Sequence, residues 1–180
     1  NVSYSTSSAD PNYTEFTGSY AIINLDDDVP SLTVTPTDTT TVTTEAGGTD
    51  TVNIVLDRQP LADVVLNLTG ADLTEVTLST DTLTFTNANW TTPQTVTFTG
   101  VDDDLSDGDQ TFNITVSVDA AQTDDLFETA EDQVFAVTNL DDDVAGLTVI
   151  PPNQLEVTED GEGVQFSVVL DTEPIGAVTV

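Results

Sequence analysis

Apolar and polar residues alternate with a period of two along most of this chain, which predicts β-strands with one buried and one solvent-facing side. The stretches with this pattern are rich in β-branched residues, as strands usually are. They are residues 51–56, 64–68, 83–86, 95–99, 112–118 and 134–138. No stretch has the three- and four-residue apolar spacing of an amphipathic helix. We therefore predict an all-β protein.

Turn-forming residues separate the predicted strands. They are Gly47-Gly48, Gln59-Pro60, Thr69-Gly70, Asn87-Ala88-Asn89 and Asp107-Gly108. Roughly seven short strands in about 110 residues are typical of an antiparallel β-sandwich of immunoglobulin-like architecture. We expect Trp90 to pack as a core or rim aromatic at one end of this sandwich rather than to serve as a platform for a ligand.

The segment Asn-Leu-Asp-Asp-Asp-Val occurs twice, at 24–29 and again at 139–144. Each copy stands between two stretches of apolar alternation, so it indicates a junction between successive modules. A tandem array of sandwiches with closing strands in 1–28, a complete module in 29–143 and opening strands in 144–180 follows from this pattern. We expect the chain to be part of a longer array, or else its partial modules to be completed by strands of neighbouring chains.

Charge restricts the possible functions more than any other property of the composition. The sequence has 33 acidic residues, one basic residue (Arg58), no histidine and no cysteine, and its net charge is -32. Such a surface repels nucleic acid and anionic lipid, and no apolar run is long enough to span a membrane. Without His, Cys or Lys the chain lacks the usual nucleophiles and bases, so we do not expect an enzyme.

The acidic residues gather in three clusters, at Glu45, in the loop 102–109 and in the triplet 141–143. Adjacent carboxylates repel one another, and the chain has almost no cations to neutralise them. Calcium takes six to eight oxygen ligands in irregular geometry, which suits carboxylates from several loops that meet at one tip of a sandwich. The spacing is not that of an EF-hand, and zinc or copper would require His or Cys. The sequence therefore predicts bound Ca2+.

The order of Glu45, the acidic loop 101–112 and Leu140-Asp141-Asp142-Asp143 resembles the Calx-β module, and the segment 83–96 is similar to a variant common in long bacterial surface proteins. This resemblance extends over the complete module and both partial ones, and it implies a seven-stranded sandwich that binds calcium at one tip. The family's ligand positions fall on Glu45, Asp102, Asp103, Asp107, Asp141, Asp142 and Asp143. Gln110 stands where the family often has a second Glu.

The family's ligand from the middle loop has no clean counterpart, and Asp72 or Glu75 can take its place. Our candidate set therefore also contains further acidic residues of the loops, the junctions and the partial modules. These are Asp72, Asp104, Asp26, Asp27, Asp28 and Glu159.

We predict a non-catalytic, calcium-binding structural repeat of a large extracellular or cell-surface adhesin, fibre or matrix protein, in which Ca2+ stiffens the junctions between repeats. The expected partners are the neighbouring repeats of the same chain, like chains in a fibre, and surface glycans. Two alternatives stay open: a salt-adapted acidic spacer without specific ion binding, and a glycan-binding adhesion module.

Overall fold

A computed structural model of the chain describes residues 1–25, 29–123, 126–154, 156–161 and 163–180. The described elements are a three-residue 3-10 helix, η1 (Pro11–Tyr13), and a series of strands. The strands are β1 (Val2–Ser5), β2 (Thr17–Tyr20), β3 (Leu32–Pro36), β4 (Thr41–Thr44), β5 (Thr49–Leu56), β6 (Val64–Thr69), β7 (Val76–Leu78), β8 (Thr82–Phe85), β9 (Gln94–Gly100), β10 (Gln110–Val118), β11 (Gln133–Leu140), β12 (Leu147–Ile150) and β13 (Ser167–Leu170).

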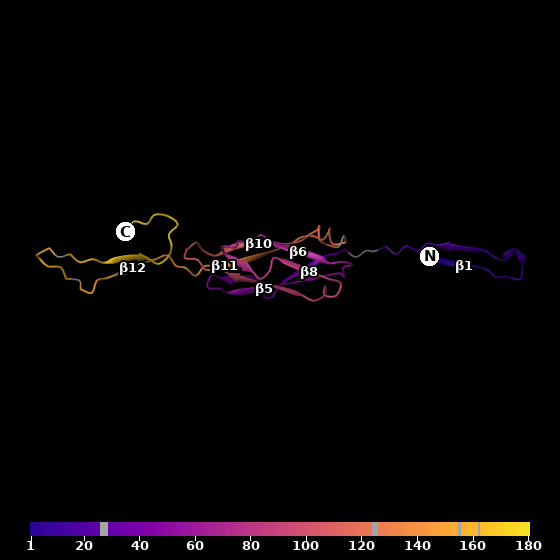
Figure 1. The fold of residues 1–180 in the computed structure, drawn as a ribbon, viewed down its shortest axis with the longest axis horizontal. Helices are drawn as coiled ribbons and strands as arrows, with labels where there is room; N and C mark the ends of the chain where they lie inside the picture. The colour runs from indigo at the N-terminus through magenta and orange to yellow at the C-terminus, as the bar shows by residue number, and fades with distance from the viewer. Residues whose placement is uncertain (26–28, 124–125, 155, 162) are drawn as a thin grey trace.

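The central part of the chain folds into a sandwich of two packed sheets (Figure 1). One sheet has five strands in the order β4-β11-β10-β6-β8, and the other has four in the order β3-β5-β9-β7. Neighbouring strands pair antiparallel except β4 and β11, which are parallel. The prediction of an all-β, immunoglobulin-like sandwich is confirmed, and the parallel pair is the one departure from an antiparallel design among the described strands.

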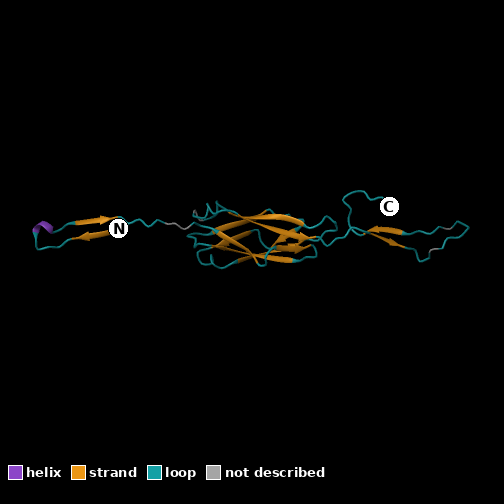
Figure 2. Ribbon diagram, turned by 180° about the vertical axis from the view of Figure 1, so that it is seen from behind, coloured by secondary structure: helices purple, strands orange, loops and turns teal. Residues whose placement is uncertain are grey.

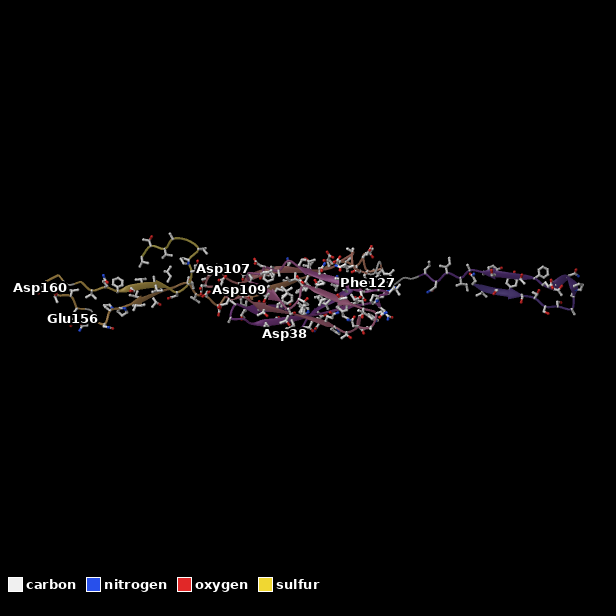
Figure 3. All side chains as sticks on the ribbon, viewed as in Figure 1. Asp38, Asp107, Asp109, Phe127, Glu156 and Asp160 are labelled. Atoms are coloured by element: carbon white, nitrogen blue, oxygen red, sulfur yellow. The ribbon has the colours of Figure 1, made fainter. Side chains whose placement is uncertain are left out.

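Alternation along each strand builds a single hydrophobic core between the sheets. In β5, for example, Val52, Ile54 and Leu56 point inward and are at most 2% exposed. Phe127, from the connection between β10 and β11, is fully buried and lies at one end of the sandwich (Figure 3). Trp90 is partly buried against this core, in agreement with the packing role predicted for it.

Two separate hairpins flank the sandwich at opposite ends of an elongated molecule (Figures 1 and 2). β1 pairs with β2 at the N-terminal end, and β12 pairs with β13 at the C-terminal end. Their apolar side chains remain in contact with solvent, as Tyr4 and Leu147 illustrate with exposed fractions of 50% and 52%. Among the described residues, no helix has the length and apolar character that crossing a membrane would require.

Charge is almost absent from the described strands. Asp50 in β5 is the only charged residue within them. Its side chain accepts a hydrogen bond from the backbone N–H of Val42 over 2.8 Å, which ties β5 to β4 across the edge of the sandwich. All other acidic residues that the structure describes lie in connections and terminal segments, so the carboxylates collect where strands end.

Candidate metal centre

Several connections meet at the tip where the chain leaves the sandwich for β12. The N–H of Glu45, in the turn between β4 and β5, donates to the carbonyl of Leu140 at the end of β11 over 3.0 Å. The N–H of Gly108, in the loop between β9 and β10, donates to a carboxylate oxygen of Asp141 over 2.7 Å. Figure 3 shows Asp107 and Asp109 of the same loop at this end of the sandwich. The three acidic clusters of the sequence are therefore brought together.

Glu45 is buried because its turn crosses from one sheet to the other. β4 belongs to the five-stranded sheet and β5 to the four-stranded sheet, so the turn between them passes over the end of the core. The turn is tight: Gly47, with a φ of 81°, and Gly48 both donate N–H bonds to the carbonyl of Thr44. Gly47 adopts a left-handed backbone that other residues rarely take. Only 1% of Glu45 is exposed as a result.

Three carboxylates form the centre of the tip. Glu45, Asp141 and Asp143 each place one oxygen within 4.8 Å of the others. Glu45 Oε2 and Asp143 Oδ2 are buried and have no hydrogen-bond partner among the described residues. A buried oxygen without a partner is costly for a neutral group and more so for a charged one. The arrangement therefore suits a cation that would complete the bonding of these oxygens.

The negative charges around this centre increase the free-energy cost of ionising its buried carboxylates. Burial raises the pKa of Glu45 from 4.5 to about 7, and the negative charges of Asp141, Asp103 and Glu75 act in the same direction, against a hydrogen bond from the backbone of Asp142. The pKa of Asp143 is also raised, first by desolvation and then by neighbouring aspartates such as Asp141. Without a cation, this tip disfavours the ionised form of its own buried carboxylates.

Glu75 supplies a further buried carboxylate, just before β7. It is 8% exposed, and its Oε2 accepts a hydrogen bond over 3.3 Å from Nδ2 of Asn139, which is fully buried. The amide of Asn139 is fixed in turn because its Oδ1 accepts a bond of 2.9 Å from Thr43 Oγ1. Burial raises the pKa of Glu75; the Asn139 bond lowers it, and Asp107 and Asp103 raise it further. Glu75 therefore belongs to the same electrostatic cluster.

Asp72, which was predicted for the same role, has a different environment. It is exposed, and its Oδ1 accepts bonds from the N–H and the hydroxyl of Thr74 over 3.0 and 2.7 Å. These bonds lower the pKa of Asp72. Asp72 thus closes its own turn, and the burial of Glu75 favours that residue as the ligand from the middle loop. Nothing in the sequence distinguishes the two.

The remaining candidates differ in burial. Asp103 is half-buried, and its Oδ1 accepts a bond of 2.7 Å from the N–H of Leu105. Glu159 is exposed in the segment between β12 and β13. The other candidates at the tip are exposed, and they are Asp102, Asp104, Asp107 and Asp142. The candidates Asp26, Asp27 and Asp28 lie outside the described residues.

No protein-family model matches this sequence, and no curated protein matches it either. Solved structures with partial similarity include the apo-form Calx CBD1 domain, with 17% identity and a TM-score of 0.45 over 64% of this chain and 100% of that one. The E. coli chaperone DraB has 9% identity and a TM-score of 0.44 over 81% of this chain and 89% of that one. CBD12 from CALX1.2 has 14% identity and a TM-score of 0.43 over 77% of this chain and 69% of that one.

Proposed function

We propose that this chain is a non-catalytic, calcium-binding structural repeat of a large extracellular or cell-surface adhesin, fibre or matrix protein. The observation that carries the proposal is the buried Glu45, whose Oε2 has no hydrogen-bond partner among the described residues and which shares the tip with Asp141 and Asp143. These three residues would hold the ion. Calcium is the metal of choice because every available donor is oxygen and the donors come from loops.

The place of the centre supports a role at the junction between repeats. Asp143 ends the sandwich, and β12 begins four residues later at Leu147. An ion bound by Glu45 and Asp143 would connect the core of one module to the segment that leads into the next. We propose that calcium stiffens this junction and that the neighbouring repeats are the main partners. Like chains in a fibre and surface glycans are further proposed partners.

Calcium titration by calorimetry, before and after chelation, tests the proposal. We expect a single Glu45→Gln substitution to weaken calcium binding at least tenfold, because it removes the charge of the most buried ligand. Glu159→Gln is the matched control, since Glu159 is exposed in a partial module. Equal calcium affinity in the two variants would contradict the assignment of Glu45 as a ligand.

Thermal unfolding with and without chelator provides the second measurement. A ligand that binds only the folded state contributes about 2.7 kcal/mol when its free concentration is 100 times its Kd. We therefore expect chelation to lower the melting temperature, and calcium but not sodium at equal ionic strength to restore it. Restoration by sodium to the same extent would support the alternative of an acidic spacer without a specific ion.

A further inference from the structure

The hairpin after the junction has the same register as the first antiparallel strand pair of the sandwich, β3 with β5, between which the chain also forms β4. β3 and β5 pair Leu32 with Leu56, and β12 and β13 pair Leu147 with Leu170. In both hairpins a leucine near the start of the first strand faces the last leucine of the second strand. The two hairpins therefore start and end at equivalent places, although the segments between their strands differ in sequence.

The residue that follows β5 and the residue that follows β13 make equivalent backbone hydrogen bonds. The N–H of Asp57 donates to the carbonyl of Ser31 over 3.1 Å, and the N–H of Asp171 donates to the carbonyl of Gly146 over 3.0 Å. The chain thus leaves both hairpins in the same direction relative to their strands. The two segments that follow are residues 57–62 and residues 171–176.

The second of these segments is paired with the acidic loop between β9 and β10. Glu173 and Leu105 form an isolated parallel β-bridge, and the N–H of Glu173 donates to the carbonyl of Asp104 over 2.6 Å. Ser106 of the acidic loop also lines a cavity of about 520 Å³ together with residues of 170–178. The pairing joins main chain to main chain, so it does not depend on the side chain at position 173.

The first segment has a proline at the same place as the second segment, which favours the same backbone conformation. Gln59 stands where Glu173 stands, and each is followed by a proline, Pro60 or Pro174. A residue before proline is forced toward extended backbone because the proline ring clashes with the helical conformation. Extended backbone is what a β-bridge needs. Both segments are therefore predisposed to add a short strand-like contact to a neighbour.

Exposure and charge indicate what segment 57–62 meets. Its apolar Leu61 is 80% exposed in the structure. Arg58, the only basic residue of the sequence, also belongs to it. Arg58 gives segment 57–62 a positive charge that segment 171–176, with Asp171 and Glu173, does not have. Opposite charges across an interface favour correct pairing over wrong partners, so in segment 57–62 the charge adds to the main-chain pairing with an acidic loop.

We propose that the segment that follows β5 in the central module and β13 in the next, which we call the docking loop (57–62 and 171–176), is an interaction surface for the acidic β9–β10 loop of the module before it. The partner is the main chain of a loop such as 102–106 in an adjacent repeat. The docking loop would set the angle between repeats by direct contact, which goes beyond the proposed binding of calcium.

Paired cysteines test the contact that the structure describes. The sequence has no cysteine, so Leu105→Cys with Glu173→Cys introduces a single possible intramolecular disulfide. Bridged residues lie roughly one strand spacing apart, about 4.7–4.9 Å, within the range of about 4.4–6.8 Å that disulfides accept between Cα atoms. We expect most molecules to form this disulfide under mild oxidation at low protein concentration, as measured by thiol labelling and peptide mass spectrometry.

The control pair is Thr84→Cys with Glu173→Cys, because Thr84 lies in β8 and pairs with Val65 away from the tip. Cross-linking of Leu105→Cys with Glu173→Cys at the level of this control would overturn the proposal. Calcium affinity is measured separately on the same variants. Failure of the cross-link is therefore distinguishable from failure of the calcium site.

A tandem protein tests whether docking loop 57–62 also contacts the β9–β10 loop of a preceding module. Residues 29–143 followed directly by residues 29–180 place one complete sandwich before another, and every member of the hydrophobic core lies between Leu32 and Val137. Leu105→Cys in the first copy and Gln59→Cys in the second then report on docking loop 57–62. We expect a disulfide between the copies to form as efficiently as the one in the variant Leu105→Cys with Glu173→Cys. Its absence, with both copies folded by circular dichroism, would overturn this part of the proposal.

Discussion

Two hairpins of this molecule, β3–β5 and β12–β13, have the same register and different surroundings. Leu32 in β3 is 3% exposed, whereas Leu147 at the equivalent place in β12 is 52% exposed. The acidic residues differ in the same way, since Glu45 is 1% exposed and Glu159, which stands at the matching position 114 residues later, is exposed. In the central module, later strands of the closed sandwich cover Leu32 and the β4–β5 turn.

This difference shows that strand pairing and burial have separate causes in this protein. Pairing within a hairpin follows from local alternation and from bonds between residues about 25 positions apart or fewer. Burial of Leu32 and Glu45 depends on β10 and β11, which come much later in the chain. A hairpin can therefore have the correct register and still lack both a core and a cluster of buried carboxylates.

The largest expected effect compares the two equivalent leucines. Leu32→Ala removes a side chain from the closed core and should lower the free energy of unfolding by about 2–5 kcal/mol. Leu147→Ala removes an exposed side chain, and we expect a change within about 0.5 kcal/mol. Urea denaturation monitored by Trp90 fluorescence measures both. Similar losses in the two variants would mean that β12–β13 is covered in solution.

The two asparagines of the repeated junction segment provide the next comparison. Asn139 is fully buried and is bonded to Thr43 and Glu75, whereas Asn24 is exposed. Asn139→Ala leaves the buried carboxylate of Glu75 without this partner, while Thr43 retains a bond to the carbonyl of Thr138; a buried group left without its partner costs about 1–3 kcal/mol. We expect Asn139→Ala to lower the unfolding free energy by about 1–3 kcal/mol and to weaken calcium binding, while Asn24→Ala changes neither.

Two glycines distinguish a closed tip from an open segment. A Cβ on Gly100 would collide with the carbonyl of Thr44 and with the side chain of Asn139, while a Cβ on Gly163 would meet nothing within 4 Å. Thr44 cannot easily shift, because its carbonyl is bonded to the β4–β5 turn. Gly100→Ala should therefore cost about 1–3 kcal/mol of stability and displace Glu45. Gly163→Ala should be neutral in the same denaturation and calcium titrations.

The last expected effect is a pH dependence of the metal-free protein. Because burial raises the pKa of Glu45 from 4.5 to about 7, the folded state retains a proton between these values that the unfolded chain has released. Stability should therefore fall as pH rises from 4.5 to 7. Calcium affinity should instead fall as pH drops below 7, since the ion must displace this proton.

Thermal unfolding of the chain and of Glu45→Gln, both treated with chelator, across this pH range measures the contribution of Glu45 to the pH dependence of stability. The variant has no titrating group at position 45, so we expect its melting temperature to depend less on pH. Glu159→Gln serves as the comparison from the open segment and should follow the unsubstituted chain. A pH profile that Glu45→Gln leaves unchanged would show that other carboxylates carry the dependence.

The amino-acid sequence by itself predicts the longer strands of the sandwich and the composition of the tip, but not the short strands β4 and β7. Alternation at 95–99 and 112–118 identifies β9 and β10 to within two residues at their ends, and the order of the acidic loops anticipates that they meet at one end. The absence of His and Cys already limits the candidate metals to those that bind oxygen. These properties are local, because side-chain period and donor chemistry do not depend on distant residues.

Only the tertiary structure decides which carboxylates are buried. Glu75 is buried and bonded to Asn139, 64 positions away in the sequence, whereas Asp72 is exposed. Thr43 likewise meets Asn139 across 96 positions. The parallel pairing of β4 with β11 likewise depends on the closed sandwich. Burial comes from residues distant in sequence rather than from sequence neighbours, so two copies of one acidic pattern become a buried cluster in one module and an exposed turn in the other.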